Sequence, residues 1–133
     1  MKANVNDPIY IAIADDDKFQ RFLLHTLIRK DRRLKLLFDA CDGQDFMAKL
    51  KLCTRLPNVC IIDLKMPRMD GVETCACIKR YNERIKIIGY TSSDDLQAIS
   101  RMKNKGAEEV VTKGNVHDLL ECVLISYLDR AFL

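Results

Sequence analysis

The fold of this chain is decided by the stretch Val59-Cys60-Ile61-Ile62-Asp63-Leu64-Lys65-Met66-Pro67-Arg68-Met69-Asp70-Gly71. Its first four residues are apolar without alternation, which is typical of a strand buried on both faces of a parallel sheet. Asp63 follows where that strand ends, Met66-Pro67 sets the shape of a loop, and Asp70-Gly71 is a turn that opens a helix. The stretch therefore predicts one strand-loop-helix unit of a parallel α/β sheet.

Short apolar runs alternate with helical patterns along the rest of the chain. The predicted strands are residues 9–14, 34–38, 59–62, 85–90 and 110–112. The predicted helices are residues 18–30, 44–53, 70–81, 94–104 and 116–131. In the first helix the apolar residues at helical spacing are Phe19, Phe22, Leu23 and Leu27. Five such units in a row predict a doubly wound α/β sandwich with right-handed crossovers.

Length and composition limit the class of protein. A chain of 133 residues fits one domain, and the residues after the fifth strand suffice for one helix. We therefore expect a single domain over residues 1–133 without a fused output domain. Apolar residues make up 48% of the chain and charged residues 31%, which excludes a disordered protein.

Targeting and charge signals are weak. No apolar run approaches the roughly 18 residues of a membrane span. The segment from Met1 to Pro8 lacks the apolar core of a signal peptide. The net charge is only +3, and the basic residues are scattered rather than aligned in a stripe. We expect a cytoplasmic protein that binds neither a membrane nor, by this chain alone, nucleic acid.

Cysteine and histidine residues do not form a metal-binding pattern. The chain has six cysteines with no Cys-x-x-Cys, and His25 and His117 stand apart from all of them in the sequence. This spacing argues against a zinc site. We expect six reduced thiols that are mostly packed as small apolar groups, and two exposed helical histidines that are not phosphorylated.

Polar side chains gather where the predicted strands end. Asp15 and Asp16 follow the first strand, Asp63 follows the third, Thr91 the fourth and Lys113 the fifth. The carboxyl ends of parallel strands meet at one edge of the sheet, where ligands bind. Carboxylates brought together there repel one another, and Mg²⁺ prefers such oxygen ligands. Three carboxylates, one ammonium and one Mg²⁺ leave the pocket near neutral, so it can accept a phosphoryl group, with one carboxylate as nucleophile.

These residues and the stretch from Ile61 to Gly71 give the chain a resemblance to the receiver domain of two-component response regulators, in particular the chemotaxis receivers. The intervals of 47 residues from Asp16 to Asp63, 28 from Asp63 to Thr91 and 22 from Thr91 to Lys113 are similar to receiver spacings. The resemblance covers about residues 9–130. It implies a flavodoxin-like (βα)5 fold with a five-stranded parallel sheet in the order 2-1-3-4-5.

The resemblance also implies roles for individual residues. Asp63 would be the phosphoacceptor and a ligand of Mg²⁺. Asp16 would bind the ion directly, Asp15 would bind it through water, and the backbone carbonyl of Lys65 would complete the protein ligands. Lys113 would pair with Asp63 and later with the phosphoryl group, toward which the Thr91 hydroxyl would move. A histidine kinase or histidine phosphotransfer protein would be the donor. A downstream protein would then read the face formed by the helix at 94–104, the strand at 110–112 and the helix at 116–131. The resemblance also allows a homodimer, and it implies no enzyme activity beyond self-catalysed phosphoryl acceptance and hydrolysis.

Some residues keep more than one interpretation. Asp17 is expected to cap the first helix rather than to bind metal. The Lys65 side chain is either a solvated loop lysine or a group that controls how water reaches the acyl phosphate. Two positions depart from the receiver pattern. Val110 stands where receivers have a rotating Tyr or Phe, and Gly114 follows Lys113 where receivers often have a cis proline. Without proline we expect a trans bond there.

Two further functions compete with a stand-alone receiver. The chain could be the N-terminal receiver of a longer DNA-binding transcription regulator, but because Met1 starts the chain we favour the stand-alone form. An aspartate-nucleophile phosphatase would need Asp-x-Asp after the first strand and a cap domain. Here the nucleophile candidate follows the third strand and the length leaves no room for a cap, so we do not favour a phosphatase.

Overall fold

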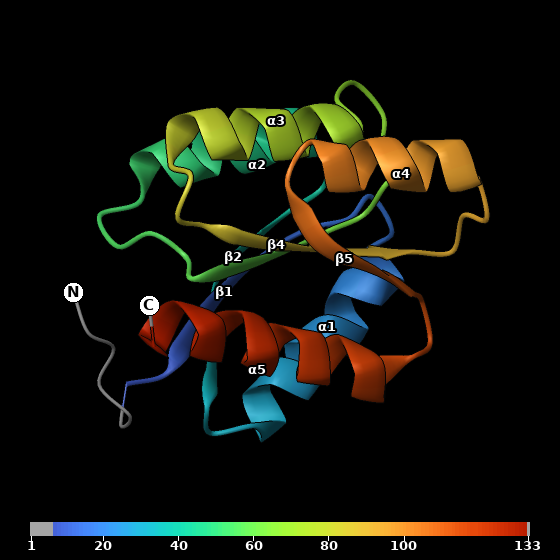
Figure 1. Cartoon of the computed structure of the whole chain (residues 1–133). Coiled ribbons are helices and arrows are strands. Elements are labelled where there is room, and N and C mark those ends of the chain that lie inside the picture. The colour runs from blue at the N-terminus through green and yellow to red at the C-terminus, as the bar shows by residue number, and fades with distance from the viewer. Residues whose placement is uncertain (1–6, 133) are drawn as a thin grey trace.

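The computed structural model of the chain describes residues 7–132, with side chains up to residue 128. Within these residues five parallel strands form one sheet in the order β2-β1-β3-β4-β5. The strands are β1 (Ile9–Ala14), β2 (Leu34–Ala40), β3 (Val59–Ile62), β4 (Lys86–Thr91) and β5 (Ala107–Thr112). The predicted doubly wound fold and its strand order are confirmed (Figure 1).

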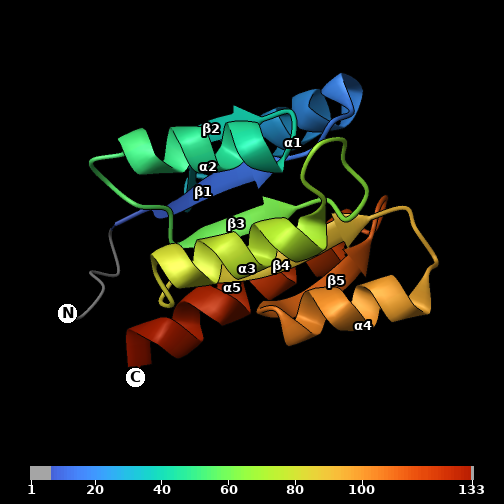
Figure 2. The same cartoon turned by 90° about the horizontal axis from the view of Figure 1, so that it is seen from above.

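Helices cover both faces of the sheet. The helices are α1 (Lys18–Lys30), α2 (Gly43–Leu52), α3 (Gly71–Tyr81), α4 (Leu96–Asn104) and α5 (Val116–Phe132). Helices α2, α3 and α4 lie on one face and α1 and α5 on the other (Figures 1 and 2). Each face has its own apolar core, one around Phe46, Ile78 and Met102 and the other around Leu24 and Leu119. The central strand β3 is buried on both faces because both cores contact it, as its unbroken apolar run predicts.

Aspartates begin four of the helices. Asp17, Asp42, Asp70 and Asp95 are the N-caps of α1 to α4, and each carboxylate accepts backbone N–H groups of the first turn. The expected capping role of Asp17 is confirmed, with Phe19 N–H donating at 2.9 Å. These caps fix the point at which each loop at the carboxyl edge of the sheet turns into a helix.

The sequence pattern placed some boundaries wrongly. Strand β2 continues to Ala40, and β5 begins at Ala107 rather than at residue 110. The missed start of β5 carries two exposed glutamates, which an edge strand tolerates because only one of its sides pairs with another strand. Helix α4 begins at Leu96 rather than at residue 94, because Asp95 is its cap.

The predicted buried face of α1 is also wrong in part. Phe19 and Phe22 are 64% and 63% exposed, while Leu24 and Ile28 are buried against the sheet. The buried pair lies four residues apart and so faces the sheet together, whereas the phenylalanines project from the flank of the helix. Leu27 packs partly against the core, as expected.

The cysteines and histidines agree only in part with the predictions from the sequence. The six cysteines, all within the described residues, carry free thiols, but only Cys60 and Cys75 are buried. His117 is exposed as expected, whereas His25 is half-buried against Asp39. None of the described helices is long and apolar enough to cross a membrane. Residues 1–6, which carry most of the excluded signal segment, lie outside the described residues.

Candidate functional site

Three carboxylates meet at the carboxyl edge of the sheet. Carboxylate oxygens of Asp15, Asp16 and Asp63 all lie within 4.8 Å of one another. The strand register causes this, because Ala14 at the end of β1 pairs with Ile62 at the end of β3. The Asp63 N–H continues the ladder by donating to the Ala14 carbonyl at 2.9 Å. Asp15 and Asp63 are buried, and Asp16 is exposed, so the cluster opens to solvent through Asp16.

Lys113 bridges two of these carboxylates. Its ammonium lies 2.9 Å from Asp15 Oδ2 and 3.0 Å from Asp63 Oδ2, and its side chain is only 11% exposed. The contact with Asp63 corresponds to the pairing that the resemblance implies, while the contact with Asp15 is not foreseen from the sequence. One ammonium therefore faces two buried carboxylates, which leaves the pocket with an excess of negative charge.

Burial and charge shift the pKa values in the pocket. Burial raises the pKa of Asp15, the charge of Asp63 raises it further, and the Asp17 N–H and Lys113 oppose these effects. Burial alone would lower the pKa of Lys113, but its bonds to Asp15 and Asp63 raise it above the ordinary value. The ionised form of Asp15 is therefore disfavoured relative to the protonated form. An additional positive charge in the pocket would favour the ionised form.

The donor set suits a divalent cation. Asp15 Oδ2 is buried, and the Lys113 ammonium that contacts it is shared with Asp63. Its neighbours are further carboxylate oxygens, which are hard ligands of the kind that Mg²⁺ and Ca²⁺ prefer. The exposed side at Asp16 leaves room for metal-bound water. The three aspartates could therefore hold a metal ion.

Asp63 sits on a tightly packed loop. Its Oδ1 accepts the Leu64 N–H at 2.7 Å, and its side chain is 6% exposed. The start of α3 presses against this loop: a Cβ on Gly71 would lie 2.3 Å from the Asp63 carbonyl oxygen. Only glycine allows that approach, so the Asp70-Gly71 turn also determines where Asp63 lies.

Thr91 and Lys65 lie beside the carboxylates in different ways. Thr91 is buried at the end of β4, its carbonyl accepts the Lys113 N–H at 2.9 Å, and its hydroxyl accepts the Ser93 N–H at 3.1 Å. The Lys65 side chain points away into solvent, 65% exposed, and pairs with Asp95 at the start of α4 at 3.6 Å. The geometry thus brings Asp15, Asp16, Asp63 and Lys113 together, with Thr91 adjacent, and leaves the Lys65 side chain outside.

The two positions that depart from the receiver pattern are well defined. Val110 is half-buried and packs against the core on the α4 face. Gly114 has a φ of +98°, which favours glycine. The expected trans bond between Lys113 and Gly114 is confirmed, since the described residues contain no cis peptide.

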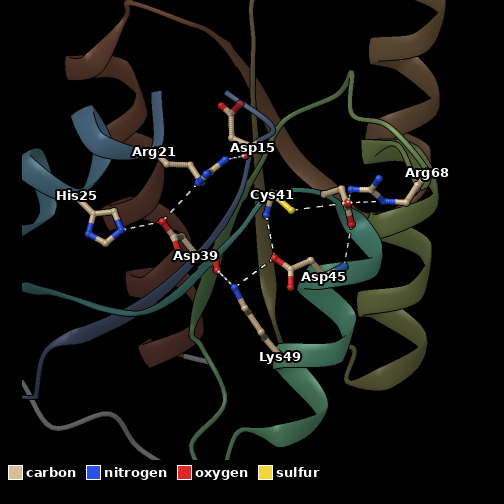
Figure 3. A network of polar contacts seen from close by, with 9 residues as sticks. Asp15, Arg21, His25, Asp39, Cys41, Asp45, Lys49 and Arg68 are labelled. Atoms are coloured by element: carbon tan, nitrogen blue, oxygen red, sulfur yellow. Dashed lines mark hydrogen bonds and ion pairs between the residues drawn. The ribbon is translucent and has the colours of Figure 1, made fainter. Parts of the chain in front are cut away.

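A polar network behind the pocket is missed by the sequence analysis. Arg21 on α1 donates to the Asp15 carbonyl at 2.6 Å and lies 3.6 Å from Asp39 Oδ2. Asp39 also contacts His25 at 2.9 Å, and its carbonyl accepts from Lys49 on α2 (Figure 3). The network joins α1, β2 and α2 directly behind Asp15. No short motif signals it, because its contacts join residues 6 to 18 positions apart that lie on three different elements and the loop after β1.

A second missed pair joins the loops on either side of the pocket. Arg68, just after Pro67, has a φ of 65°, which is uncommon for a residue with a side chain. Its guanidinium binds the buried carboxylate of Asp42, the cap of α2 (Figure 3). The Asp45 N–H and this guanidinium hold the pKa of Asp42 below its ordinary value, although burial opposes them. The pair holds the loop after Asp63 against the loop after β2.

Comparisons with known proteins agree with this geometry. The family model of the response regulator receiver domain matches residues 11–124. Protein PilG of Pseudomonas aeruginosa is 32% identical over 114 residues, which are 81% of this chain and 78% of that protein. The protein-glutamate methylesterase/protein-glutamine glutaminase of Desulfitobacterium hafniense is 32% identical over 107 residues. Those residues are 80% of this chain but only 27% of that protein, so the chain spans about a quarter of its length.

Solved structures share the fold. A CheY-like receiver domain protein from Methanospirillum hungatei has a TM-score of 0.83 at 22% identity, covering 93% of this chain and 97% of its own. A second structure with this fold is that of the CheX-CheY-BeF3-Mg²⁺ complex from Borrelia burgdorferi. That structure matches with a TM-score of 0.79 at 22% identity, covering 92% of this chain and 90% of the other.

Proposed function

Since the chain belongs to the response regulator receiver domain family of two-component signalling, we propose that it accepts a phosphoryl group on Asp63 and passes the signal to a partner protein. The observation that carries this proposal is the buried Asp63 carboxylate, in contact with Lys113 and within 4.8 Å of the oxygens of Asp15 and Asp16. We place this activity in the cytoplasm.

We assign Mg²⁺ to the three carboxylates, with the backbone carbonyl of Lys65 as a further ligand. The fit of the donor set supports this metal, and so does the Mg²⁺ named in the Borrelia complex. When bound, the ion supplies positive charge that offsets the negative charge of the incoming phosphoryl oxygens. Asp16 and Asp15 would hold the ion, and its charge would relieve the repulsion between their carboxylates.

The transfer moves one phosphoryl group between two side chains. A carboxylate oxygen of Asp63 attacks phosphorus, a P–O bond forms, and the P–N bond to the donor histidine breaks. Lys113 contacts the Asp63 carboxylate before the transfer and a phosphoryl oxygen afterwards. The donor is a histidine kinase or a histidine phosphotransfer protein. The chain assists its own phosphorylation and the later hydrolysis of the acyl phosphate on Asp63. It turns over no separate substrate.

The signal is a change of surface. The Thr91 hydroxyl gives up the Ser93 N–H and turns to the phosphoryl group, which draws in the loop that leads to α4. The face of α4, β5 and α5 then binds a downstream protein, or a second copy of the chain, with a different affinity. Val110 is too small to make the swing of an aromatic switch, so movement of the loop after Thr91 carries the coupling here.

A second candidate function is supported by the relatives. The chain matches only 27% of the length of the methylesterase from Desulfitobacterium, so in that relative a receiver is joined to a larger part. A DNA-binding response regulator from Staphylococcus aureus matches with a TM-score of 0.81 at 26% identity. The alternative is therefore a receiver at the head of a longer DNA-binding regulator. The full reading frame distinguishes it from the stand-alone form.

Phosphoryl transfer from acetyl phosphate tests the proposal. With Mg²⁺, intact-protein mass spectrometry should show a gain of one phosphoryl group in the wild-type chain and none in Asp63→Asn. The matched control is Asp94→Asn, which removes an exposed carboxylate outside the pocket and should label like the wild type. Chelation of Mg²⁺ should abolish labelling. Persistent labelling of Asp63→Asn would refute the assignment.

A further inference from the structure

A buried tyrosine hydroxyl contacts the backbone next to the pocket lysine. Tyr90 directly precedes Thr91 on β4, is 3% exposed and packs in the core between the sheet and α1 and α5. Its Oη accepts the N–H of Gly114 at 2.9 Å. A buried tyrosine hydroxyl normally finds such a partner, but here the partner is the residue after Lys113.

This bond and one other hold Lys113 from both sides. The Lys113 N–H donates to the Thr91 carbonyl at 2.9 Å, and the Gly114 N–H donates to Tyr90 Oη at the same distance. Two consecutive residues of β4 thus fix the two peptide groups that flank the lysine Cα. The direction in which the lysine side chain leaves the backbone is thereby set toward Asp15 and Asp63.

Gly114 makes this anchoring necessary. A Cβ at this position would meet nothing within 4 Å, so its φ of +98° rather than lack of space requires glycine. Glycine is also the residue with the greatest backbone freedom. A loop with glycine beside Lys113 would leave the ammonium poorly placed unless a contact restrained it, and the hydroxyl of Tyr90 provides that contact.

We propose that Tyr90 is a positioning residue for phosphoryl acceptance, acting through the Gly114 N–H to hold Lys113 against Asp15 and Asp63. This inference rests on the proposed function. Part of the placement of Lys113 is thereby assigned to a core side chain on the α1 and α5 face of the sheet. The contact is made at Gly114, where receivers often have proline after the lysine.

Tyr90→Phe isolates the hydroxyl. The ring stays in the core, and the freed Gly114 N–H can bind water because Gly114 is exposed, so the fold should survive. The matched control is Ile88→Val, which trims a fully buried side chain on the same strand and in the same core cluster. Amide hydrogen exchange followed by NMR should show Gly114 exchanging about tenfold faster in Tyr90→Phe and unchanged in Ile88→Val.

The rate of phosphoryl acceptance then tests the link to Lys113. With acetyl phosphate and saturating Mg²⁺, Tyr90→Phe should label about two- to tenfold more slowly than the wild type, the factor expected for one ordinary hydrogen bond. Ile88→Val should label at the wild-type rate. In a Lys113→Met background the same tyrosine substitution should change the rate by a factor of about one, because the lysine that it positions is gone.

Three results would overturn the inference. They are a wild-type labelling rate in Tyr90→Phe, an equal slowing in Ile88→Val, or a full additional slowing in the Lys113→Met background. Each of these can occur while the wild-type chain is labelled normally, so the proposed function would stand. Absence of labelling in the wild type would instead remove the proposed function and this inference together.

Discussion

At the scale of single residues, the electrostatics of the pocket act most clearly on the pKa of Asp15. It shares one ammonium with Asp63 and is buried, so its pKa is raised from 3.8 mainly by desolvation. The folded state therefore binds this proton more tightly than the unfolded state does. Without a divalent cation, its contribution to the free energy of unfolding falls as the pH rises from 3.8 through the folded-state pKa.

The prediction concerns Asp15→Asn in metal-free buffer. Removing the titrating group should flatten the decline in the free energy of unfolding over the pH range just above 3.8. Urea unfolding at a series of pH values measures this. Asp94→Asn, which alters an exposed loop carboxylate, should keep the wild-type profile. Superimposable profiles for Asp15→Asn and the wild type would show that the Asp15 proton is not bound more tightly in the folded state.

The sequence predicts the site residues that lie directly after the ends of strands. Asp15, Asp16, Asp63 and Lys113 each follow a strand, and parallel strands bring their ends together whatever the details of packing. The second partner of Lys113 and the hydroxyl of Tyr90 were not foreseen. Both depend on side-chain direction and depth, which follow from the packed core and leave no periodic trace in the sequence.

At the scale of elements, the N-cap of α2 makes an additional ion pair that, among the described residues, the N-cap of α3 lacks. Asp42 caps α2 and also binds Arg68, whereas Asp70 caps α3 through the Glu73 N–H and is exposed. Asp42→Ala should therefore destabilise the chain more than Asp70→Ala, which should cost about 1 kcal/mol as an ordinary cap.

The loss in Asp42→Ala should reach about 2 kcal/mol, because the cap and the contact between the two loops disappear together. Urea unfolding at neutral pH gives both free energies. The Arg68→Ala variant serves as the control for the loop contact, since it leaves the α2 cap intact. If Asp42→Ala and Asp70→Ala lost the same stability, the pairing with Arg68 would contribute nothing to the fold.

Element positions were predictable because the local signals agreed. The apolar run at β3 and the cap Asp17 gave correct bounds, whereas α3 begins at Gly71, one residue after its predicted start, because Asp70 is its cap. The start of β5 was missed because its first residues include Glu108 and Glu109, which carry no apolar alternation. Pairing with β4 makes this segment a strand, and pairing is a tertiary effect that the local sequence does not encode.

The whole molecule is a sheet between two helical layers, and the layers decide which apolar residues matter. On α1, Leu24 is buried under the sheet, whereas Phe22 is 63% exposed although it is the larger side chain. Leu24→Ala should cost about 2–5 kcal/mol because it opens a cavity in the core. Phe22→Ser should change stability by less than about 0.5 kcal/mol.

Thermal and urea unfolding compare the two α1 variants directly. The helical pattern alone ranks the phenylalanines as core residues and so makes the opposite prediction. A large loss in Phe22→Ser would support that ranking and contradict the described packing. The fold class itself was predictable at this scale, since five alternating units with two unbroken apolar strands leave few topologies.

The pocket takes Asp15 from the segment after β1 and Lys113 from the segment after β5, so its parts enter the chain almost a hundred residues apart. During synthesis the aspartates emerge first, and the lysine follows only when the last strand has been made. A chain still growing on the ribosome therefore has the acidic groups of the pocket but not yet the ammonium that pairs with them. The full charge pairing of the pocket can therefore form only after β5 and the lysine that follows it have joined the fold.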